Sequence, residues 1–299
     1  MGQETFRSNK ISVVELDDSS NSLVLRHTLD HSFPATKVQF TPDGQSYYDL
    51  MGTTSDALRI FRISNEGKMT LLDTLHSSAN LGYSGPYSSM DWNTYDPTII
   101  GVSSNDSTCL IWQLETSQCV TISKAKVKSH LISNDKSVNE IGFMSKDTFV
   151  TASDDGSIRQ FDIRDMKSST ILYDGGTEKT PLVRVQTNKK DGNLLGVLGS
   201  HSNKILIIDV RKPDRVYKTC VNPNAEINSI AWSPANKQLI CSGSSDNQAL
   251  IWQVKDELAE GTSTKTYNAN AEISNVQWGP RHPQWISITF DKSVEILRV

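Results

Sequence analysis

Adjacent carboxylates are the first residues in this chain whose type and spacing are typical of catalysis. Asp154 and Asp155 precede Gly156, an arrangement that could serve as a general acid and base or as part of a calcium loop. Asp155, however, also falls on a position that recurs along the whole chain. We therefore interpret it as a structural turn residue and expect no catalytic role for the pair.

Cysteine and histidine, the common nucleophiles and metal ligands, are scattered. The cysteines form no CxxC pair, lie in apolar runs and are expected to be buried thiols; they are Cys109, Cys119, Cys220 and Cys241. The sequence contains no HExxH, GxSxG, P-loop or GxGxxG-plus-acid arrangement. We predict no catalytic residue, no metal site and no cofactor, and that the protein is not an enzyme.

Two arginines have the chemistry of protein recognition. Phe161-Asp162-Ile163-Arg164 is echoed by Ile208-Asp209-Val210-Arg211. An exposed guanidinium can make two parallel hydrogen bonds with a carboxylate, which gives a specific contact. The alternative is that each arginine only bonds to neighbouring loops. The candidate partner-binding residues are Phe161, Asp162, Arg164, Asp209 and Arg211.

Two further segments are weaker candidates for binding. Lys124, Lys126, Lys128 and His130 alternate with other residues, so a strand would place the lysines on one face. That face could contact phosphate or an acidic peptide, or it could be an edge strand protected by lysine. The long loop Ser77 to Pro86 could bind a partner or be a plain surface loop.

The candidate residues lie within a sequence repeat that runs through the whole chain and that we expect to set their positions in the fold. Its template is Ser or Thr, any residue, Asp or Ser, five residues, and then a bulky apolar residue. The six copies are Thr53-Ser55-Phe61, Ser104-Asp106-Trp112, Ser153-Asp155-Phe161, Ser200-Ser202-Ile208, Ser244-Asp246-Trp252 and Thr289-Asp291-Leu297. A weaker seventh copy runs from Ser8 to Val14, and successive copies lie 44 to 51 residues apart.

The template has a physical explanation in a tight turn between antiparallel strands. The Asp or Ser accepts hydrogen bonds from backbone N–H groups of its own turn, and the bulky residue fills the layer between sheets. A second column marks the first strand of each unit: Phe40, Trp92, Phe143, Thr187, Trp232 and Trp278. No segment has a convincing helical stripe, so the class is all-β.

Four-stranded units of this length bury both faces when they stack around an axis, so we predict a single β-propeller domain over residues 1–299. The turn Asp before Trp is typical of WD repeats. Counting strands gives 25, whereas seven four-stranded blades need 28. We expect a seven-bladed propeller whose first strands are missing, because Met1 is an internal start. The alternative is six blades, with a strand near Leu23 to Arg26 closing the last.

The chain resembles the WD-repeat family of the plant transparent-testa-glabra and anthocyanin regulators and the animal DYRK-kinase-binding, cullin-ligase-associated adaptor. The resemblance covers nearly all of residues 9–299. It is carried by Asn9-Lys10-Ile11, Ser88-Ser89-Met90-Asp91-Trp92-Asn93 with Asp96-Pro97, Ser103-Ser104-Asn105-Asp106-Ser107-Thr108-Cys109, Gln248-Ala249-Leu250-Ile251-Trp252, Glu272-Ile273-Ser274-Asn275-Val276-Gln277-Trp278 and Glu295-Ile296-Leu297-Arg298-Val299. Two positions depart from the family pattern: Asn134 stands where His is common, and Thr187 replaces Trp.

The resemblance implies a non-catalytic adaptor that assembles transcription regulators or protein kinases. Phe161 to Arg164 also resembles the box through which some propellers dock onto a cullin-ligase adaptor, which implies a substrate receptor as an alternative. A ligand-binding or hydrolytic propeller is the alternative from another class.

Composition narrows these functions. The net charge of −4 gives no general attraction to nucleic acid or membrane, and 36% hydrophobic residues allow a large core. With no long apolar run and no secretory signal, we expect other proteins as partners and a cytoplasmic and nuclear location.

Overall fold

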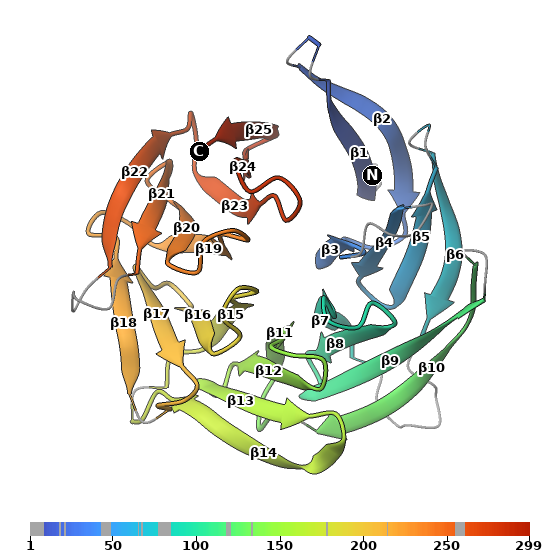
Figure 1. Cartoon of the computed structure of the whole chain (residues 1–299), viewed down its shortest axis with the longest axis horizontal. Helices are drawn as coiled ribbons and strands as arrows, with labels where there is room; N and C mark the ends of the chain where they lie inside the picture. Colours follow the sequence, from blue (N-terminus) through green and yellow to red (C-terminus); the bar gives the residue numbers. More distant parts are fainter. Residues whose placement is uncertain are drawn as a thin grey trace, which may run out of the picture. The chain divides into compact units, whose positions relative to one another are not determined.

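The computed structural model describes residues 9–17, 19–20, 22–42, 49–64, 66, 68–76, 85–117, 121–132, 134–177, 179–213, 215–254 and 261–299. Within these ranges the chain forms 25 β-strands, and no described segment is a helix that could cross a membrane (Figure 1). The strands fall into two compact units, Met1–His130 and Leu131–Val299, and each is described by itself.

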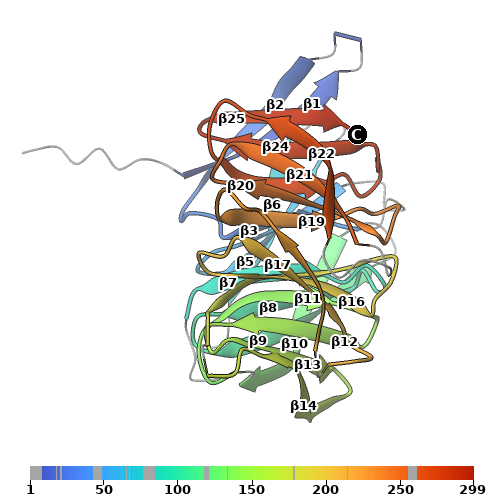
Figure 2. The ribbon, with the colours of Figure 1, turned by 90° about the vertical axis from the view of Figure 1, so that its left-hand side faces the viewer.

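The first unit contains a hairpin and two four-stranded antiparallel sheets. The hairpin is β1 (Asn9–Asp17) with β2 (Ser22–His31). One sheet consists of β3 (Lys37–Phe40), β4 (Asp49–Thr54), β5 (Leu58–Ile63) and β6 (Met69–Leu75). The other consists of β7 (Tyr87–Trp92), β8 (Ile99–Ser104), β9 (Thr108–Ser117) and β10 (Thr121–Ile132), whose last two residues belong to the second unit. The turn end of the hairpin stands clear of β3 to β6 in both ribbon views (Figure 2).

The second unit contains four consecutive sheets whose strands pair in chain order (Figure 1). The first is β11 (Val138–Phe143), β12 (Thr148–Ser153), β13 (Ser157–Asp162) and β14 (Asp165–Asp174). The second is β15 (Leu182–Thr187), β16 (Leu194–Gly199), β17 (Lys204–Asp209) and β18 (Val216–Val221). The third is β19 (Ile227–Trp232), β20 (Leu239–Ser244), β21 (Gln248–Gln253) and β22 (Thr262–Asn268), and the last is β23 (Ile273–Trp278), β24 (Trp285–Phe290) and β25 (Ser293–Arg298).

The predicted all-β propeller architecture is confirmed, but the number of blades is six rather than seven. Six sheets have three or four strands, and β1 and β2 form a two-stranded sheet of their own. The predicted total of 25 strands and the strand after Ser8 are both confirmed. The alternative of six blades is therefore confirmed in its count; the segment near Leu23, which that alternative assigned to the last blade, lies in β2 and pairs with β1.

The predicted column of first-strand residues is also confirmed. Each of the six positions is the last residue of a first strand, from Phe40 in β3 to Trp278 in β23. Five of them are buried, whereas Phe40 is 50% exposed. Within each unit the core consists of apolar clusters that neighbouring sheets share, as stacked propeller blades require.

The tryptophan at the bulky position of the template meets a hydroxyl in one sheet and none in another. Trp252 on β21 donates from Nε1 to Ser242 Oγ on β20 at 2.8 Å. In the β7 to β10 sheet Trp112 is the matching tryptophan, and the register places Val102 where Ser242 lies. Trp112 Nε1 is buried and has no hydrogen-bond acceptor among the described residues.

We expect Val102→Thr to stabilise the protein, because threonine has nearly the shape of valine and can offer Trp112 Nε1 an acceptor. An unsatisfied buried donor costs about 1–3 kcal/mol, so a net gain of about 1 kcal/mol in the free energy of unfolding is expected after the new hydroxyl is desolvated. Urea denaturation measures it. In a Trp112→Phe background the same substitution should destabilise, and a gain in that background would refute the explanation.

The buried cysteines allow a test that depends on pH. Burial raises the pKa of the Cys220 and Cys241 thiols to about 12. Because the thiolate is the reactive form, both should resist alkylation by iodoacetamide at pH 8.5 in the folded protein and react rapidly in urea. Mass spectrometry of tryptic peptides separates the two sites, and fast modification of either without denaturant would contradict the buried position.

Candidate functional site

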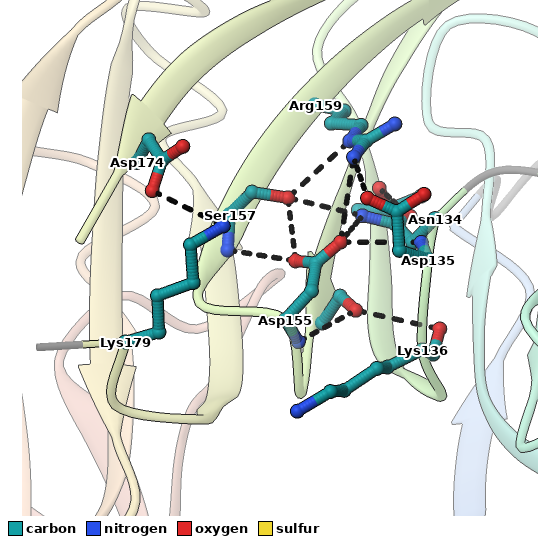
Figure 3. Close-up of polar contacts among 10 residues, drawn as sticks. Asn134, Asp135, Lys136, Asp155, Ser157, Arg159, Asp174 and Lys179 are labelled. Atoms are coloured by element: carbon teal, nitrogen blue, oxygen red, sulfur yellow. Dashed lines mark hydrogen bonds and ion pairs between the residues drawn. The ribbon is translucent and has the colours of Figure 1, made fainter. Parts of the chain in front are cut away.

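The sequence template produces a polar corner at the turn between the second and third strands of a blade. At Asp155, between β12 and β13, Oδ1 accepts hydrogen bonds from the backbone N–H of Ser157 at 2.9 Å and from its hydroxyl at 2.6 Å (Figure 3). Oδ2 accepts from the backbone N–H of Asp135 at 3.3 Å and lies 3.5 Å from Arg159 Nη2. One carboxylate therefore ties the turn to the loop that enters the sheet.

The charge state of Asp155 follows from this environment. Burial raises the pKa of the carboxyl, but hydrogen bonds from Ser157 and Asp135 and the charge of Arg159 outweigh it, so the pKa lies below its usual value. The carboxylate stays ionised at neutral pH and is fully engaged. It has the features of a structural corner rather than of an acid or base in catalysis, which would need a pKa near the working pH.

Two other predicted corners have the same construction. Asp106 Oδ1 accepts from the backbone N–H of Thr108 at 3.1 Å, and Asp246 Oδ1 accepts from that of Gln248 at 3.2 Å. The residue after each aspartate has a positive φ of 79° at Gly156, 70° at Ser107 and 67° at Asn247. The predicted serine two residues before the aspartate joins each network: Ser104, Ser153 and Ser244.

The prediction of an equivalent corner is wrong for Asp291. The pairing of β24 with β25 continues to Phe290 opposite Ser293, which leaves Asp291 and Lys292 as a two-residue turn. Asp291 itself has the positive φ, 47°, and is exposed. The Thr289 hydroxyl lies 3.5 Å from the carbonyl of Asn275 on the first strand of the sheet instead of serving the turn. The shorter turn leaves no room for the corner network.

Five of the predicted bulky positions are buried as expected, whereas Leu297 is half-buried and Val14 is 44% exposed. Trp112, Phe161 and Trp252 all lie in the core, and Phe161 stacks on Phe149 with ring centroids 5.3 Å apart. A buried ring cannot touch a partner directly. The prediction that Phe161 binds a partner is therefore wrong, and this residue instead anchors the strand that ends at Asp162.

The two Asp-x-Arg segments adopt the same local structure at the turns between third and fourth strands. Asp162 Oδ1 accepts from the backbone N–H and from Nε of Arg164, both at 2.9 Å, while Nη2 reaches Oδ2 at 2.5 Å. Asp209 and Arg211 repeat this with distances of 3.0, 2.8 and 2.6 Å. We call these two segments the arginine tips.

The arginine tips present a fixed guanidinium to solvent. The side chains of Arg164 and Arg211 are 68% and 59% exposed, whereas the Asp209 side chain is buried. Hydrogen bonding by Arg164 lowers the pKa of Asp162 to about 2, and Arg211 likewise lowers that of Asp209. Arg164 also lies 3.5 Å from Asp147 of its own sheet. The aspartates hold the arginines, and the arginines are the groups that a partner can reach.

The other predicted binding segments receive no structural test. The side chains of the basic alternation from Lys124 to His130 lie outside the described residues, although its backbone is part of β10. Residues 77–84 of the long loop also lie outside them. At the two departures from the family pattern, Asn134 accepts from the Thr151 hydroxyl at 2.9 Å, and Thr187 is buried at the end of β15.

Sequence reasoning missed a set of asparagines that join neighbouring sheets. Asn139 Nδ2 donates to the carbonyl of Leu182 at 2.9 Å, and Asn228 Nδ2 donates to that of Ile273 at 2.9 Å. Each acceptor is the first residue of the next sheet's first strand. Both asparagines stand four residues before the end of their own first strand, at Phe143 and Trp232, so the shared offset was the available signal.

The described residues offer binding surfaces more readily than a reaction centre. No three His, Cys, Asp or Glu side chains in the described ranges lie close enough together to hold a metal ion. The ionised groups that carry shifted pKa values at the corners and tips are engaged by adjacent donors. What the arrangement can do chemically is present two rigid guanidinium groups to carboxylates of another protein.

Comparisons with known proteins extend these observations. A family profile described as the NUP159/214 beta propeller matches residues 113–290. The DDB1- and CUL4-associated factor 7 homolog of Dictyostelium discoideum is 35% identical over 301 residues, which cover 98% of this chain and 88% of that protein. A WD repeat-containing protein of Saccharomyces cerevisiae is 30% identical over 82% of this chain, which spans only 54% of the yeast protein.

A solved structure agrees at the level of fold. A chain of the mitotic checkpoint complex superposes with a TM-score of 0.72 and 17% identity, covering 98% of this chain and 82% of the other. The repeated corners, the six sheets and the similarity over nearly the whole sequence all agree. The chain belongs to the WD-repeat β-propeller family, together with the DDB1- and CUL4-associated factor 7 homolog.

Proposed function

We propose that this protein is a non-catalytic adaptor that assembles regulatory complexes and that its arginine tips dock onto a ubiquitin-ligase adaptor. The observation that carries the proposal is the repeated geometry of the tips. In each of two neighbouring sheets, an aspartate accepts two hydrogen bonds from the side chain of an exposed arginine and so fixes its position. A preorganised side chain loses little conformational entropy on binding, which favours its use as an anchor.

The WD-repeat relatives support a non-catalytic protein-interaction adaptor. One relative is described as associated with DDB1 and CUL4, and this supports the role of substrate receptor for a cullin-RING ligase. Assembly of transcription regulators and protein kinases, membership of the narrower group that includes the plant transparent-testa-glabra regulators, and a cytoplasmic and nuclear location belong to the same proposal. An adaptor of this kind binds its partners through its surface and catalyses no reaction on them.

Affinity purification from cells tests the proposal. The tagged wild-type chain should recover regulatory proteins together with a DDB1-type ligase adaptor, as identified by mass spectrometry. Arg164→Ala should reduce recovery of the ligase adaptor by about tenfold or more, since arginine anchors in interfaces are often worth 2 kcal/mol or more. The other recovered proteins should be unaffected.

Lys204→Ala is the matched control, because Lys204 is also exposed but begins β17, the strand that ends at Asp209. It should leave all recoveries unchanged. Recovery of the ligase adaptor at wild-type levels by Arg164→Ala contradicts docking at that tip. Failure of the wild-type chain to enrich any protein contradicts the adaptor role as a whole.

A further inference from the structure

A groove opens on the second unit between β14 and the segment that joins β17 to β18. Its volume is about 390 Å³. One wall is formed by Ile171, Tyr173 and Asp174 of β14, and the other by Pro213, Arg215 and Val216. It is separate from the guanidinium groups of the arginine tips, neither of which lines it.

The β14 wall combines an open strand edge with an exposed apolar residue. β14 is the outermost strand of its sheet and pairs only with β13. A register shift between Ile158 and Arg159 turns Leu172 into the core and leaves Ile171 50% exposed on the groove side. Unpaired strand edges bind extended peptides through backbone hydrogen bonds, and apolar recesses beside them accept alternate side chains.

The opposite wall supplies a positive charge. Arg215 is exposed and forms no ion pair with any described residue. The carboxylate of Asp174, across the groove, lies 3.8 Å from Lys179 Nζ, so its charge is already offset (Figure 3). The groove therefore presents an apolar surface at Ile171 and Pro213 beside one guanidinium that no carboxylate of the described residues engages.

We propose that this groove receives an extended acidic and apolar segment of a partner protein. The segment pairs with the outer edge of β14, places an apolar side chain over Ile171 and Pro213, and directs a carboxylate to Arg215. Residues two apart in a strand share one face, so a segment with an apolar and an acidic residue two positions apart turns both toward the groove. The inference rests on the proposed adaptor role and adds a second docking surface to it.

The probe for this site is a fluorescein-labelled ten-residue peptide in which valine and glutamate take turns at every second position and serine fills the positions between them. Fluorescence anisotropy with the full chain should show saturable binding that weakens as salt rises, because the charged contact is partly exposed. A peptide with lysine in place of glutamate should not bind. A peptide N-methylated at alternate residues should also fail, since it cannot complete the backbone pairing with β14.

Two variants and one control locate the binding. Arg215→Glu and Ile171→Glu should each weaken binding of the valine-glutamate peptide by about tenfold or more, whereas Lys204→Glu should change it less than about twofold. Thermal melts confirm that each variant is folded. Lack of saturable binding to the wild-type chain, or equal affinity for wild type and Arg215→Glu, would overturn the inference.

Failure of the groove proposal and failure of docking by the arginine tips give different results. Capture of the ligase adaptor by the arginine tips should persist in Arg215→Glu, because that residue is outside both tips. Peptide binding should persist in Arg164→Ala. Retained capture with no peptide binding overturns only the groove, and retained peptide binding without capture overturns only the docking by the tips.

Discussion

Replacement of Phe143 by alanine is expected to lower the free energy of unfolding by about 3–5 kcal/mol, the usual cost of removing a buried aromatic ring. Phe143 ends β11 and is completely buried. Its ring meets that of Phe149 edge to face, with centroids 5.9 Å apart. The substitution leaves a cavity beside Phe149 that the rigid strands around it cannot close. Urea denaturation followed by tryptophan fluorescence measures the loss.

Phe40 is the matched control, because it occupies the same position of the repeat at the end of β3. It is 50% exposed, so Phe40→Ala removes little buried surface and should cost less than about 1 kcal/mol. A difference of less than about 1 kcal/mol between the two variants would show that the Phe143 ring does not fill a close-packed part of the core.

Replacement of Asp155 by asparagine is expected to cost about 2–3 kcal/mol of stability, because charged hydrogen bonds in a buried site are lost together. The two carboxylate oxygens accept from donors on both sides, at Ser157 and Asp135. An amide nitrogen in place of either oxygen would face a donor, and Arg159 would lose the charge of its buried partner. The change in the urea midpoint at pH 7 gives the size of the effect.

The pH dependence gives an independent reading of the same corner. The folded-state pKa of Asp155 lies below its unfolded value, so its contribution to stability is present above the ordinary pKa of 3.8 and is lost as pH falls through the lower folded value. The difference in stability between wild type and Asp155→Asn should therefore narrow as the pH is lowered below about 4. A difference that is constant from pH 7 to pH 2 would contradict an ionised corner.

Asp291→Asn is the control at the position that the template treats as equivalent. Asp291 is exposed in a two-residue turn with positive φ, a conformation that asparagine tolerates well. Its replacement should change the free energy of unfolding by less than about 0.5 kcal/mol. Equal losses at Asp155 and Asp291 would mean that the two turns share one structure after all.

Residue spacing predicted the repeated turns and strands because the distance between a turn residue and the next buried residue sets the length of the strand between them. An aspartate two residues after a serine and six before an aromatic defines both the turn and the strand that follows, as at Asp155 and Asp246. The same logic placed the ends of the first strands and the number of strands. It failed at Asp291, where the pairing of the two strands continues to Phe290 and the turn shortens. The length of this turn depends on how β24 pairs with β25. Spacing within one strand does not predict that pairing.

The number of blades and the roles of the residues at the arginine tips could not be predicted from the sequence, because both depend on which segments pack together. A strand-like run such as Asn9 to Asp17 indicates a strand but not its partner, and the partner is β2. Sequence also suggested Phe161 as a contact residue because an aromatic precedes the Asp-x-Arg segment. Only the packing shows that Phe161 is buried and that Asp162 holds Arg164 in place. The groove beside Ile171 depends on a register shift that carries no sequence signature.

The claim on which the functional account depends is that exposed arginines held by their own aspartates are the docking groups of this adaptor. Isothermal titration calorimetry of the purified chain with a purified DDB1-type ligase adaptor tests it most directly. We expect the wild-type chain and Lys204→Glu to bind, and the folded double variant Arg164→Glu and Arg211→Glu to lose about a hundredfold or more in affinity. Equal affinity of the wild type and the folded double variant would contradict it.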